Sequence, residues 1–346
     1  MPRMQLHMIP MHDLPVVADE ATAPPAVVHL DELTYSSWGS PLTLPQYLKR
    51  ERRMRARPFS RGHRYWILRD GESPLASCES YEVPLALSPP RAAPRRGVVH
   101  GIASVFVEQR LRGHRYASAL LTGVHEHLAR EGVLACYLMS EIGPSLYARL
   151  GYLARPLRLC RYAAADLAAE RLPSPLPFTW LAAPDLPALL AERYRALRPA
   201  LGIETNLAQL DWHLQRSRYY AEELGRPHAP HLGARCGDAF VLWQASYPKN
   251  LLRVLMLYPG ERLARPGAPI DPRGPELEAV RHVLHAARFT AAHLGLSHVE
   301  VWENPANSAY LRGGARLPAD DVPMLLPLSP LVHGEDWQDY ERCHWL

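Results

Sequence analysis

The segment from residue 98 to residue 128 changes from the pattern of a buried strand to the pattern of a helix, across a short basic loop. Residues 98–107 (VVHGIASVFV) are almost continuously apolar, which is typical of a strand in the middle of a sheet. Apolar residues then recur at helical spacing from Ala117 to Leu128, and Gly132 stands where a glycine often ends a helix. A strand, a loop and a helix in this order indicate an α/β fold.

The flanking segments predict the rest of one α/β unit, complete by Tyr162. A helix is expected at about 43–57. Asp70-Gly71 is a hairpin turn between two alternating segments, and Pro144 and Gly151 bound a short helix. The strands expected besides 98–107 are 64–69, 75–87, 133–139 and about 153–162.

The second half repeats the order of the first. Residues 301–314 echo residues 138–151: each has a strand that ends in Glu, then a turn, then a tyrosine followed four residues later by glycine. This match predicts a duplication in which a long proline-rich loop replaces the basic loop of the first half. The elements expected here are helices at about 185–197, 207–224 and 276–294, and strands at about 239–247, 251–257 and 298–302.

A chain of 346 residues is long enough to form two domains. We expect a loosely structured lead over 1–30, one domain over 31–165 and a second over 175–346, with a hinge at Pro173–Pro177.

The composition excludes several classes of protein. With 47% hydrophobic and 21% charged residues, the chain is neither largely disordered nor collagenous. It has no apolar run long enough to cross a bilayer and no signal-peptide core, so a cytoplasmic protein without membrane partners is expected. The 5 cysteines never form CxxC, and no His pair has a third ligand at metal spacing, so no metal is predicted.

Arginine dominates the basic residues. Of 39 Lys and Arg residues only Lys49 and Lys249 are lysine, while the net charge is +4. Most of this excess fits a genome rich in arginine codons, although some arginines can recognise phosphate or carboxylate. The arginines at 50–64 are expected on a solvated helix face, or against an acidic partner. No nucleic-acid-reading module is recognisable, so no nucleic-acid partner is predicted.

The loop between the 98–107 strand and the following helix is predicted to bind an anion. The first N–H groups of a helix have no partner within the helix, and the helix dipole adds positive potential. Small residues let an anion approach, and arginines add charge. The small residues are Gly113, Ala117, Ser118 and Ala119, and the arginines are Arg110, Arg112 and Arg115. Neither a P-loop nor GxGxxG is present, which disfavours a nucleoside triphosphate or a simple Rossmann cofactor.

This loop resembles the signature of the GNAT acyl-CoA N-acetyltransferases, in which Gln/Arg-x-x-Gly-x-Gly/Ala cradles the coenzyme A pyrophosphate. The match is 112–117 (RGHRYA), where Arg115 replaces the usual central glycine. Residues 140–152 (SEIGPSLYARLGY) look like the GNAT segment whose tyrosine faces the leaving sulfur. With 75–80 (LASCES), Leu210–His213 and Val241–Ala245, the chain is most similar to the fungal lysine N6-acetyltransferase family.

The resemblance implies a GNAT fold, a mixed and mostly antiparallel sheet with flanking helices, plus a second degenerate GNAT-like lobe without the pyrophosphate loop. It also implies acetyl-CoA as cosubstrate and Tyr147 as general acid, which protonates the departing thiolate. The coenzyme would be held by two segments, a splayed strand and the loop. Their residues are Ser104, Val105, Phe106 and Val107, then Arg112, Gly113, His114, Arg115, Tyr116, Ala117 and Ser118.

The general base stays open among several groups. The family's usual base position is Gly101 here, so the candidates are its neighbour His100, Glu79 on the preceding strand and Glu141 at the end of the next one. The terminal carboxylate of Leu346 is a further alternative, used by some two-lobed relatives.

The expected reaction is direct transfer of acetyl to a primary amine of a small molecule, with the side-chain amine of free L-lysine as the preferred acceptor. Another amine, such as an aminoglycoside or a protein lysine, is the alternative within enzymes. The alternative outside enzymes is a catalytically silent regulator that binds acyl-CoA. Arg115 in place of the usual glycine and the unassigned general base favour this alternative. The second lobe is expected to close the acceptor cleft, with Trp212, Trp243 and Trp302 as lining or core residues. The oligomeric state is not predicted.

Overall fold

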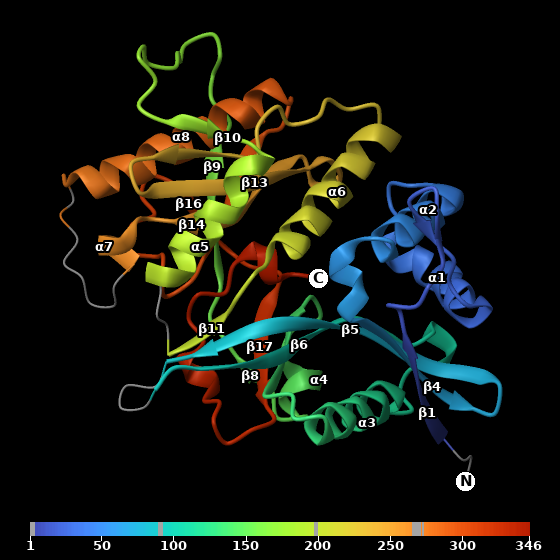
Figure 1. Cartoon of the computed structure of the whole chain (residues 1–346). Helices are drawn as coiled ribbons and strands as arrows, with labels where there is room; N and C mark the ends of the chain where they lie inside the picture. Colours follow the sequence, from blue (N-terminus) through green and yellow to red (C-terminus); the bar gives the residue numbers. More distant parts are fainter. Residues whose placement is uncertain (1–3, 89–92, 197–199, 265–270, 272) are drawn as a thin grey trace. The chain divides into compact units, whose positions relative to one another are not determined.

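A computed structural model describes residues 4–88, 93–196, 200–264, 271 and 273–346. The chain divides into two compact units. The first unit comprises residues 1–155, 321–336 and 346, and the second comprises residues 156–320 and 337–345. Figure 1 gives the element labels used below.

The first unit is built on a mixed sheet with the order β1-β4-β5-β6-β7-β17-β8. All neighbours are antiparallel except β6 and β7, which run parallel. The hairpin expected around Asp70-Gly71 is confirmed as β4 and β5. The strands are β1 (Met4–Pro10), β4 (His63–Asp70), β5 (Ser73–Leu87), β6 (Arg95–Phe106), β7 (Ala135–Ser140), β8 (Leu153–Ala154) and β17 (Val322–Pro327).

Helices cover both faces of this sheet because side chains alternate along its strands. Trp66 and Leu68 of β4 pack with α3 (Tyr116–Arg130), whereas Tyr65 and Ile67 pack with α1 (Pro25–Trp38). The α1 side also carries α2 (Leu44–Arg55), and a short helix, α4 (Ser145–Ala148), follows β7. Figure 1 shows α3 beneath β5 and β6.

The second unit repeats this topology with the strand order β10-β12-β13-β14-β15-β9-β16. Its parallel pair is β14 and β15, and β15 is followed by the antiparallel β9, as β7 is followed by β17 in the first unit. The strands are β9 (Arg158–Ala163), β10 (Thr179–Leu181), β12 (Gly233–Cys236), β13 (Ala239–Ser246), β14 (Leu251–Tyr258), β15 (His298–Glu303) and β16 (Ala315–Pro318). The matching order confirms that the second half repeats the fold of the first.

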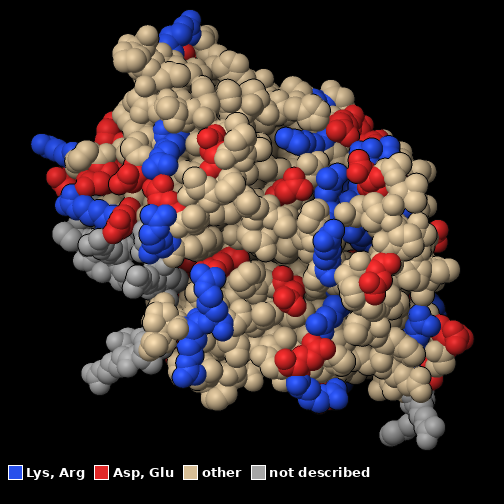
Figure 2. Space-filling model, viewed as in Figure 1, with Lys and Arg blue, Asp and Glu red and all other residues tan. Residues whose placement is uncertain are grey.

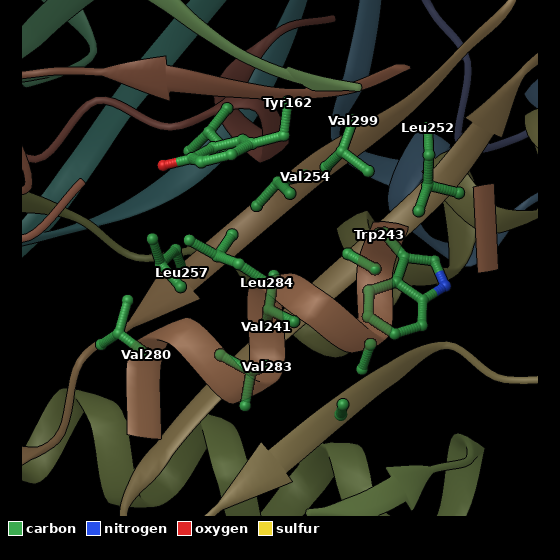
Figure 3. Packing of buried hydrophobic residues seen from close by; sticks show 14 of the residues in the cluster. Tyr162, Val241, Trp243, Leu252, Val254, Leu257, Val280, Val283, Leu284 and Val299 are labelled. Carbon is green, nitrogen blue, oxygen red and sulfur yellow. The ribbon is translucent and has the colours of Figure 1, made fainter. Parts of the chain in front are cut away.

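Alternation also builds the core of the second unit. Val241 and Trp243 of β13 pack against Val280 and Val283 of α8 (Pro275–His293), as Figure 3 shows from close by. On the other face, Phe240 and its alternate neighbours pack with leucines of α5 (Leu186–Ala196) and α6 (Leu207–Glu223). The remaining named elements are β2 (Val16–Val17), β3 (Glu20–Ala21), β11 (Leu201–Ile203) and α7 (Glu261–Ala264).

The two halves of the chain exchange strands, so the boundaries differ from the expected 31–165 and 175–346. The strand expected at about 153–162 is split, because β8 joins the sheet of the first unit while β9 joins that of the second. In return, β17 from the second half pairs with β7. Each sheet thereby gains an antiparallel neighbour for the strand that follows its central helix. The boundary lies at Arg155/Pro156 rather than at the proline-rich 173–177.

The N-terminal segment is more regular than the loose lead expected over 1–30. Residues 4–10 form β1, paired with β4 from Met4↔Asp70 to Pro10↔Arg64, and α1 begins at Pro25. Pairing with β4 satisfies the backbone N–H and C=O groups of this segment.

The surface is a mixture of charges. In the view of Figure 2, acidic side chains lie among the arginines rather than apart from them. No helix within the described ranges combines the length and the apolar character that crossing a bilayer requires.

Candidate functional site

The centre of the first unit is a pair of parallel strands that separate. β6 and β7 pair only from Val99 to Gly101 and from Ala135 to Tyr137, although both strands continue beyond these residues. On its other side β6 contains a bulge, because Ser77 pairs with Phe106 while Glu79 pairs with Ala103. The backbone of 102–106 is therefore not bonded to β7 and can offer N–H and C=O groups to a ligand.

Ser104 lies at this bulge in a left-handed conformation, with φ of +52°. This conformation is uncommon outside glycine and costs about 1 kcal/mol or more. Its hydroxyl donates a 3.2 Å hydrogen bond to Glu79 Oε2 on β5. Val105 and Val107 are half-buried and Phe106 is buried, with its ring 6.1 Å from that of Trp38.

The basic loop ends in a second left-handed residue. Arg115 is the N-cap of α3 with φ of +63° and ψ of +19°, and Gly113 has φ of +85°. The fold thus places at Arg115 the backbone conformation that glycine adopts most readily, which gives a physical reason for glycine there in the GNAT signature. The Arg112 side chain donates to Val107 O at 3.2 Å, which folds the loop back on the end of the strand.

The helix N-termini of the two units differ in charge. The first turn of α3 carries no acidic residue, and residues 112–115 before it are exposed. The first turn of α8 carries Glu276 and Glu278, and a hydrogen bond from the backbone lowers the pKa of Glu276. A carboxylate already occupies the position near the α8 N-terminus that an external anion would take. Of these two helices, α3 is therefore the one whose N-terminus has no such competitor.

Tyr147 lies on α4, just beyond the end of β7. Its side chain is 6% exposed and packs in the α3-side core, with its ring 5.8 Å from that of Tyr152. Burial, Cys78 and Glu141 raise the pKa of Tyr147 to about 12, so the phenol is protonated at neutral pH. Its sequence counterpart Tyr310 is also buried, but lies in a turn after β15 rather than on a helix.

Glu79 is the centre of a buried polar cluster on the α1 side of the sheet. Tyr81 donates a 3.1 Å hydrogen bond to Glu79 Oε2, the same oxygen that accepts from Ser104. Arg55 Nη2 lies 3.6 Å and His63 Nε2 3.7 Å from Glu79 Oε1. Burial raises the pKa of Glu79 to about 7, against the opposing effect of Arg55. Glu79 therefore exchanges its proton near neutral pH.

Arg55 is fixed by a second carboxylate. It donates bidentate hydrogen bonds to Asp31 of α1, at 2.6 and 2.7 Å. Arg55 and Arg50 are buried, so the expectation that the arginines at 50–64 form a solvated face is wrong for these two. Carboxylates compensate the two buried charges: Arg50 bonds Glu51, the next residue of α2, and Arg55 bonds Asp31 of α1.

His63 is neutral, because burial and Arg55 hold the pKa of its imidazole well below the usual range. Its ring stacks on Tyr81 with 4.4 Å between centroids. The sequence did not point to Asp31, Arg55, His63 or Tyr81. The contact of His63 with Glu79 depends on a register shift between Leu68 and Arg69, for which the sequence gives no signal.

His100 and Glu79 lie on opposite faces of the sheet. His100 is fully buried, with Nδ1 3.2 Å from Ser80 Oγ, and Ser80 Oγ also accepts a hydrogen bond from Trp66 on the α3 side. Burial and the nearby Arg64 lower the pKa of His100 to about 4. Glu141 is exposed beyond the end of β7. The three predicted base candidates, Glu79, His100 and Glu141, therefore lie apart from one another.

Leu346 packs on the strand position at which the GNAT base is usual. A methyl group added at Gly101 would lie 2.2 Å from Leu346 Cδ1 and 2.8 Å from the Tyr137 hydroxyl. Any side chain at Gly101 would displace these groups. The three tryptophans considered as cleft lining, Trp212, Trp243 and Trp302, are each less than 5% exposed.

No metal centre is found in the described part of the chain, where no three His, Cys, Asp or Glu side chains gather.

Comparisons with known proteins agree with this topology. Residues 168–317 match the family model of the LYC1 GNAT-like C-terminal domain. No curated protein sequence matches the chain.

Solved structures share the fold across almost the whole chain. The GCN5-related N-acetyltransferase from Kribbella flavida is 17% identical, with a TM-score of 0.51, over 93% of this chain and 71% of that one. The one from Anabaena variabilis is 12% identical, with a TM-score of 0.52, over 94% and 73%. A conserved Enterococcus faecalis protein of unknown function is 12% identical, with a TM-score of 0.55, over 94% and 72%. The chain thus has the fold of these GNAT structures, and its residues 168–317 are similar to the LYC1 GNAT-like C-terminal domain.

Proposed function

We propose that this protein is an acetyl-CoA-dependent N-acetyltransferase that transfers the acetyl group directly to the side-chain amine of free L-lysine. The observation that carries the proposal is the combination, in one unit, of separated central strands and a helix N-terminus that carries no acidic residue. The separated strands offer backbone groups to a thioester, and the helix N-terminus offers N–H donors to a pyrophosphate. Lysine as the acceptor follows from the resemblance of the chain to the fungal lysine N6-acetyltransferase family.

In this proposal coenzyme A lies along two segments of the first unit. Residues 112–118 hold the pyrophosphate through backbone N–H groups, with Arg112 and Arg115 adding charge. Backbone groups of 104–107 hold the pantetheine and polarise the thioester carbonyl. The exposed residues before α3 and the absence of acidic residues in its first turn support this assignment.

The two proton transfers are assigned to opposite sides of the sheet. Glu79 accepts a proton from the lysine ammonium, directly or through water, and the free amine then attacks the thioester carbonyl carbon. As the tetrahedral intermediate collapses, the C–S bond breaks and Tyr147 donates its phenolic proton to the thiolate. The nitrogen then loses its second proton, which returns Tyr147 to the phenol, and Glu79 releases the first proton to solvent. The products are N6-acetyl-lysine and coenzyme A. The pKa of Glu79 near 7 and the protonated state of Tyr147 support these roles.

His100 is less suited to the base role, because it faces the α3 side and its Nδ1 is engaged with Ser80. Glu141 is assigned no proton transfer. The carboxylate of Leu346 remains the alternative to Glu79, since Leu346 contacts Gly101 of β6.

An amine panel tests the proposal. The full chain is incubated with acetyl-CoA and, separately, L-lysine, an aminoglycoside or a lysine-containing peptide, and thiol release is followed while coenzyme binding is measured by calorimetry. The proposal expects turnover with L-lysine at the highest kcat/KM. Turnover only with the other amines would contradict the acceptor, and coenzyme binding without turnover would indicate the regulator.

A further inference from the structure

Arg55 of α2 lies beside two carboxylates of the first unit, and its contacts with them are unequal. Its Nη1 and Nη2 donate hydrogen bonds of 2.6 and 2.7 Å to the two oxygens of Asp31 on α1. The same Nη2 lies 3.6 Å from Glu79 Oε1, which is too long for a hydrogen bond. Asp31 and Arg55 are only 5% and 6% exposed, so water does not compete for these contacts. Asp31 therefore engages the guanidinium nitrogen that faces Glu79.

The two oxygens of Glu79 have different surroundings. Oε2 accepts hydrogen bonds from Tyr81 and Ser104. Oε1 faces Arg55 Nη2 and, at 3.7 Å, His63 Nε2, and no group among the described residues donates a hydrogen bond to it. A proton adds most readily to a carboxylate oxygen whose lone pairs are not already used by donors. Oε1 is therefore the oxygen of Glu79 that accepts a proton.

The charges of this cluster do not balance when all its carboxylates are ionised. The carboxylates are those of Asp31, Glu51 and Glu79, and the guanidinium groups are those of Arg50 and Arg55. Arg50 bonds Glu51 and Arg55 bonds Asp31, so ionising Glu79 adds an excess negative charge to a buried site. Burial raises the pKa of Glu79 to about 7, and this pairing explains why Arg55 does not return it to the ordinary range of glutamate.

The other titratable groups around Glu79 do not change charge near neutral pH. They are Asp31, His63 and Tyr65 on neighbouring elements, and Cys78 and Tyr81 on β5. Burial raises the pKa of Tyr65, Cys78 and Tyr81 well above the usual ranges, and burial and Arg55 hold that of His63 well below. Burial raises the pKa of Asp31 and Arg55 lowers it, and its bidentate contact is that of a carboxylate ion. Of these groups, Glu79 is thus the one that titrates near pH 7.

Compensation of the Arg55 charge does not by itself require Asp31. Glu79 lies beside Arg55 and would compensate the guanidinium on its own, as a buried pair. Such a pair would keep Glu79 ionised and make it a weak base, because an adjacent guanidinium favours the carboxylate form. With Asp31 in place, the charge of Arg55 is compensated and Glu79 still binds a proton.

We infer that Asp31 is a positioning residue of the proposed reaction: it holds Arg55 away from Glu79 Oε1, so that this oxygen accepts the proton of the acceptor amine. The inference rests on the proposed function for the role of Glu79 as base, whereas the contacts that carry it belong to the first unit alone. Without the Asp31 carboxylate, Arg55 would turn to Glu79 and take the place of the proton.

The titration of Glu79 measures this role without any turnover. The full chain is isotopically labelled at its glutamate carboxyl carbons and followed by NMR, and the Glu79 signal is identified by its absence in Glu79→Gln. We expect a midpoint near pH 7 in the unsubstituted protein and at about pH 6 or lower in Asp31→Asn, which frees Arg55 to bond Glu79. Glu32→Gln, which changes the exposed neighbour of Asp31 on α1, should leave the midpoint where it is.

A second pair of variants shows whether Asp31 acts through Arg55 or by its own charge. Arg55→Gln should raise the midpoint, and adding Asp31→Asn to Arg55→Gln should move it much less than Asp31→Asn does alone. Equal shifts in the two backgrounds would overturn the inference, as would an unchanged midpoint in folded Asp31→Asn. If Asp31→Asn does not fold, crystal structures of the unsubstituted protein below and above the midpoint decide. Arg55 bonded to Asp31 in both supports the inference, and Arg55 moved onto Glu79 Oε1 at the higher pH overturns it.

The pH profile of kcat/KM separates the inference from the proposed function. Its rising limb should move to lower pH in Asp31→Asn together with the midpoint of the titration. A shifted midpoint in a protein that acetylates no amine would sink the proposed function and keep the hold of Asp31 on Arg55. Turnover of L-lysine with an unshifted limb in Asp31→Asn would keep the reaction and overturn the inference.

Discussion

Ser104 Oγ donates a hydrogen bond to Glu79 Oε2 over 3.2 Å, and this bond joins the bulge of β6 to the one carboxylate that is buried beside it. The bulge separates the backbone that is proposed to hold the thioester, and the carboxylate is the proposed base. This contact therefore joins the two proposed parts of the reaction, and Ser104 makes it from a left-handed backbone conformation.

The pH dependence of the rate tests Glu79. The folded protein binds the Glu79 proton up to about pH 7, so kcat/KM should rise as the pH passes through 7 and Glu79 becomes ionised. Glu79→Gln should lower the rate by 10²–10⁴-fold, an order of magnitude typical of a general base. Glu82→Gln, an exposed glutamate on the same strand, is the control. If kcat/KM of Glu79→Gln still rises through pH 7, another group is the general base, and Leu346 is the first to examine.

Removing the Tyr147 hydroxyl tests the acid. Tyr147→Phe keeps the ring in its contact with Tyr152 and deletes only the proton donor. We expect kcat to fall about 10²-fold or more with little change in coenzyme affinity. Tyr310→Phe, the counterpart in the second unit, should leave kcat unaltered. Steady-state kinetics with coenzyme titration measure both variants, and equal losses in the two would mean that Tyr147 acts only through packing.

Arg115 offers a test of backbone strain. Arg115→Gly removes a side chain at positive φ, where a residue other than glycine costs roughly 1–2 kcal/mol. Arg112→Gly removes the same side chain at an extended position, where it relieves no strain and loses the hydrogen bond to Val107 O. Urea unfolding should find Arg115→Gly more stable than Arg112→Gly by at least about 1–2 kcal/mol. The opposite order would mean that the Arg115 side chain makes a stabilising contact that outweighs the strain.

The segment after residue 336 is held by a buried ion pair. Arg193 Nη2 lies 2.6 Å from Glu341 Oε2, and Glu341 Oε1 accepts the N–H of Leu257. Burial raises the pKa of Glu341 to about 7, against the effect of Arg193. Glu341→Gln leaves Arg193 as a buried charge and should cost about 3–5 kcal/mol. In Glu341→Gln, hydrogen exchange should be faster over residues 337–345. In Glu335→Gln, which changes an exposed glutamate, it should stay as in the unsubstituted protein. Equal protection of these residues in both variants would argue against this anchor.

Elements with strong periodicity could be predicted from the sequence. The hairpin at Asp70-Gly71, the central strand, and the helices at 116–130, 207–223 and 275–293 lie within a few residues of their expected bounds. Turn chemistry and apolar spacing are local properties, so a single sequence carries them. The exchange of β9 and β17 is not local, because it depends on which sheet edge each strand meets. The strand β1 could not be predicted either, because it is defined by its pairing with β4.

The loop and Tyr147 could be located because their residues are contiguous in a motif. The surroundings of Glu79 could not, because Asp31, Arg55 and His63 come from separate elements that meet only through packing and a one-residue register shift. Arg55 illustrates the difficulty: within a run of arginines nothing marks the one that is buried.

Product analysis after incubation of the full chain with acetyl-CoA and L-lysine tests the proposed reaction most directly. Coenzyme A and N6-acetyl-lysine should form in equal amounts, as seen by thiol titration and mass spectrometry, and Tyr147→Phe should slow the formation of both. Bound coenzyme with no acetyl-lysine formed, or acetylation on the α-amine instead, would contradict the proposed reaction.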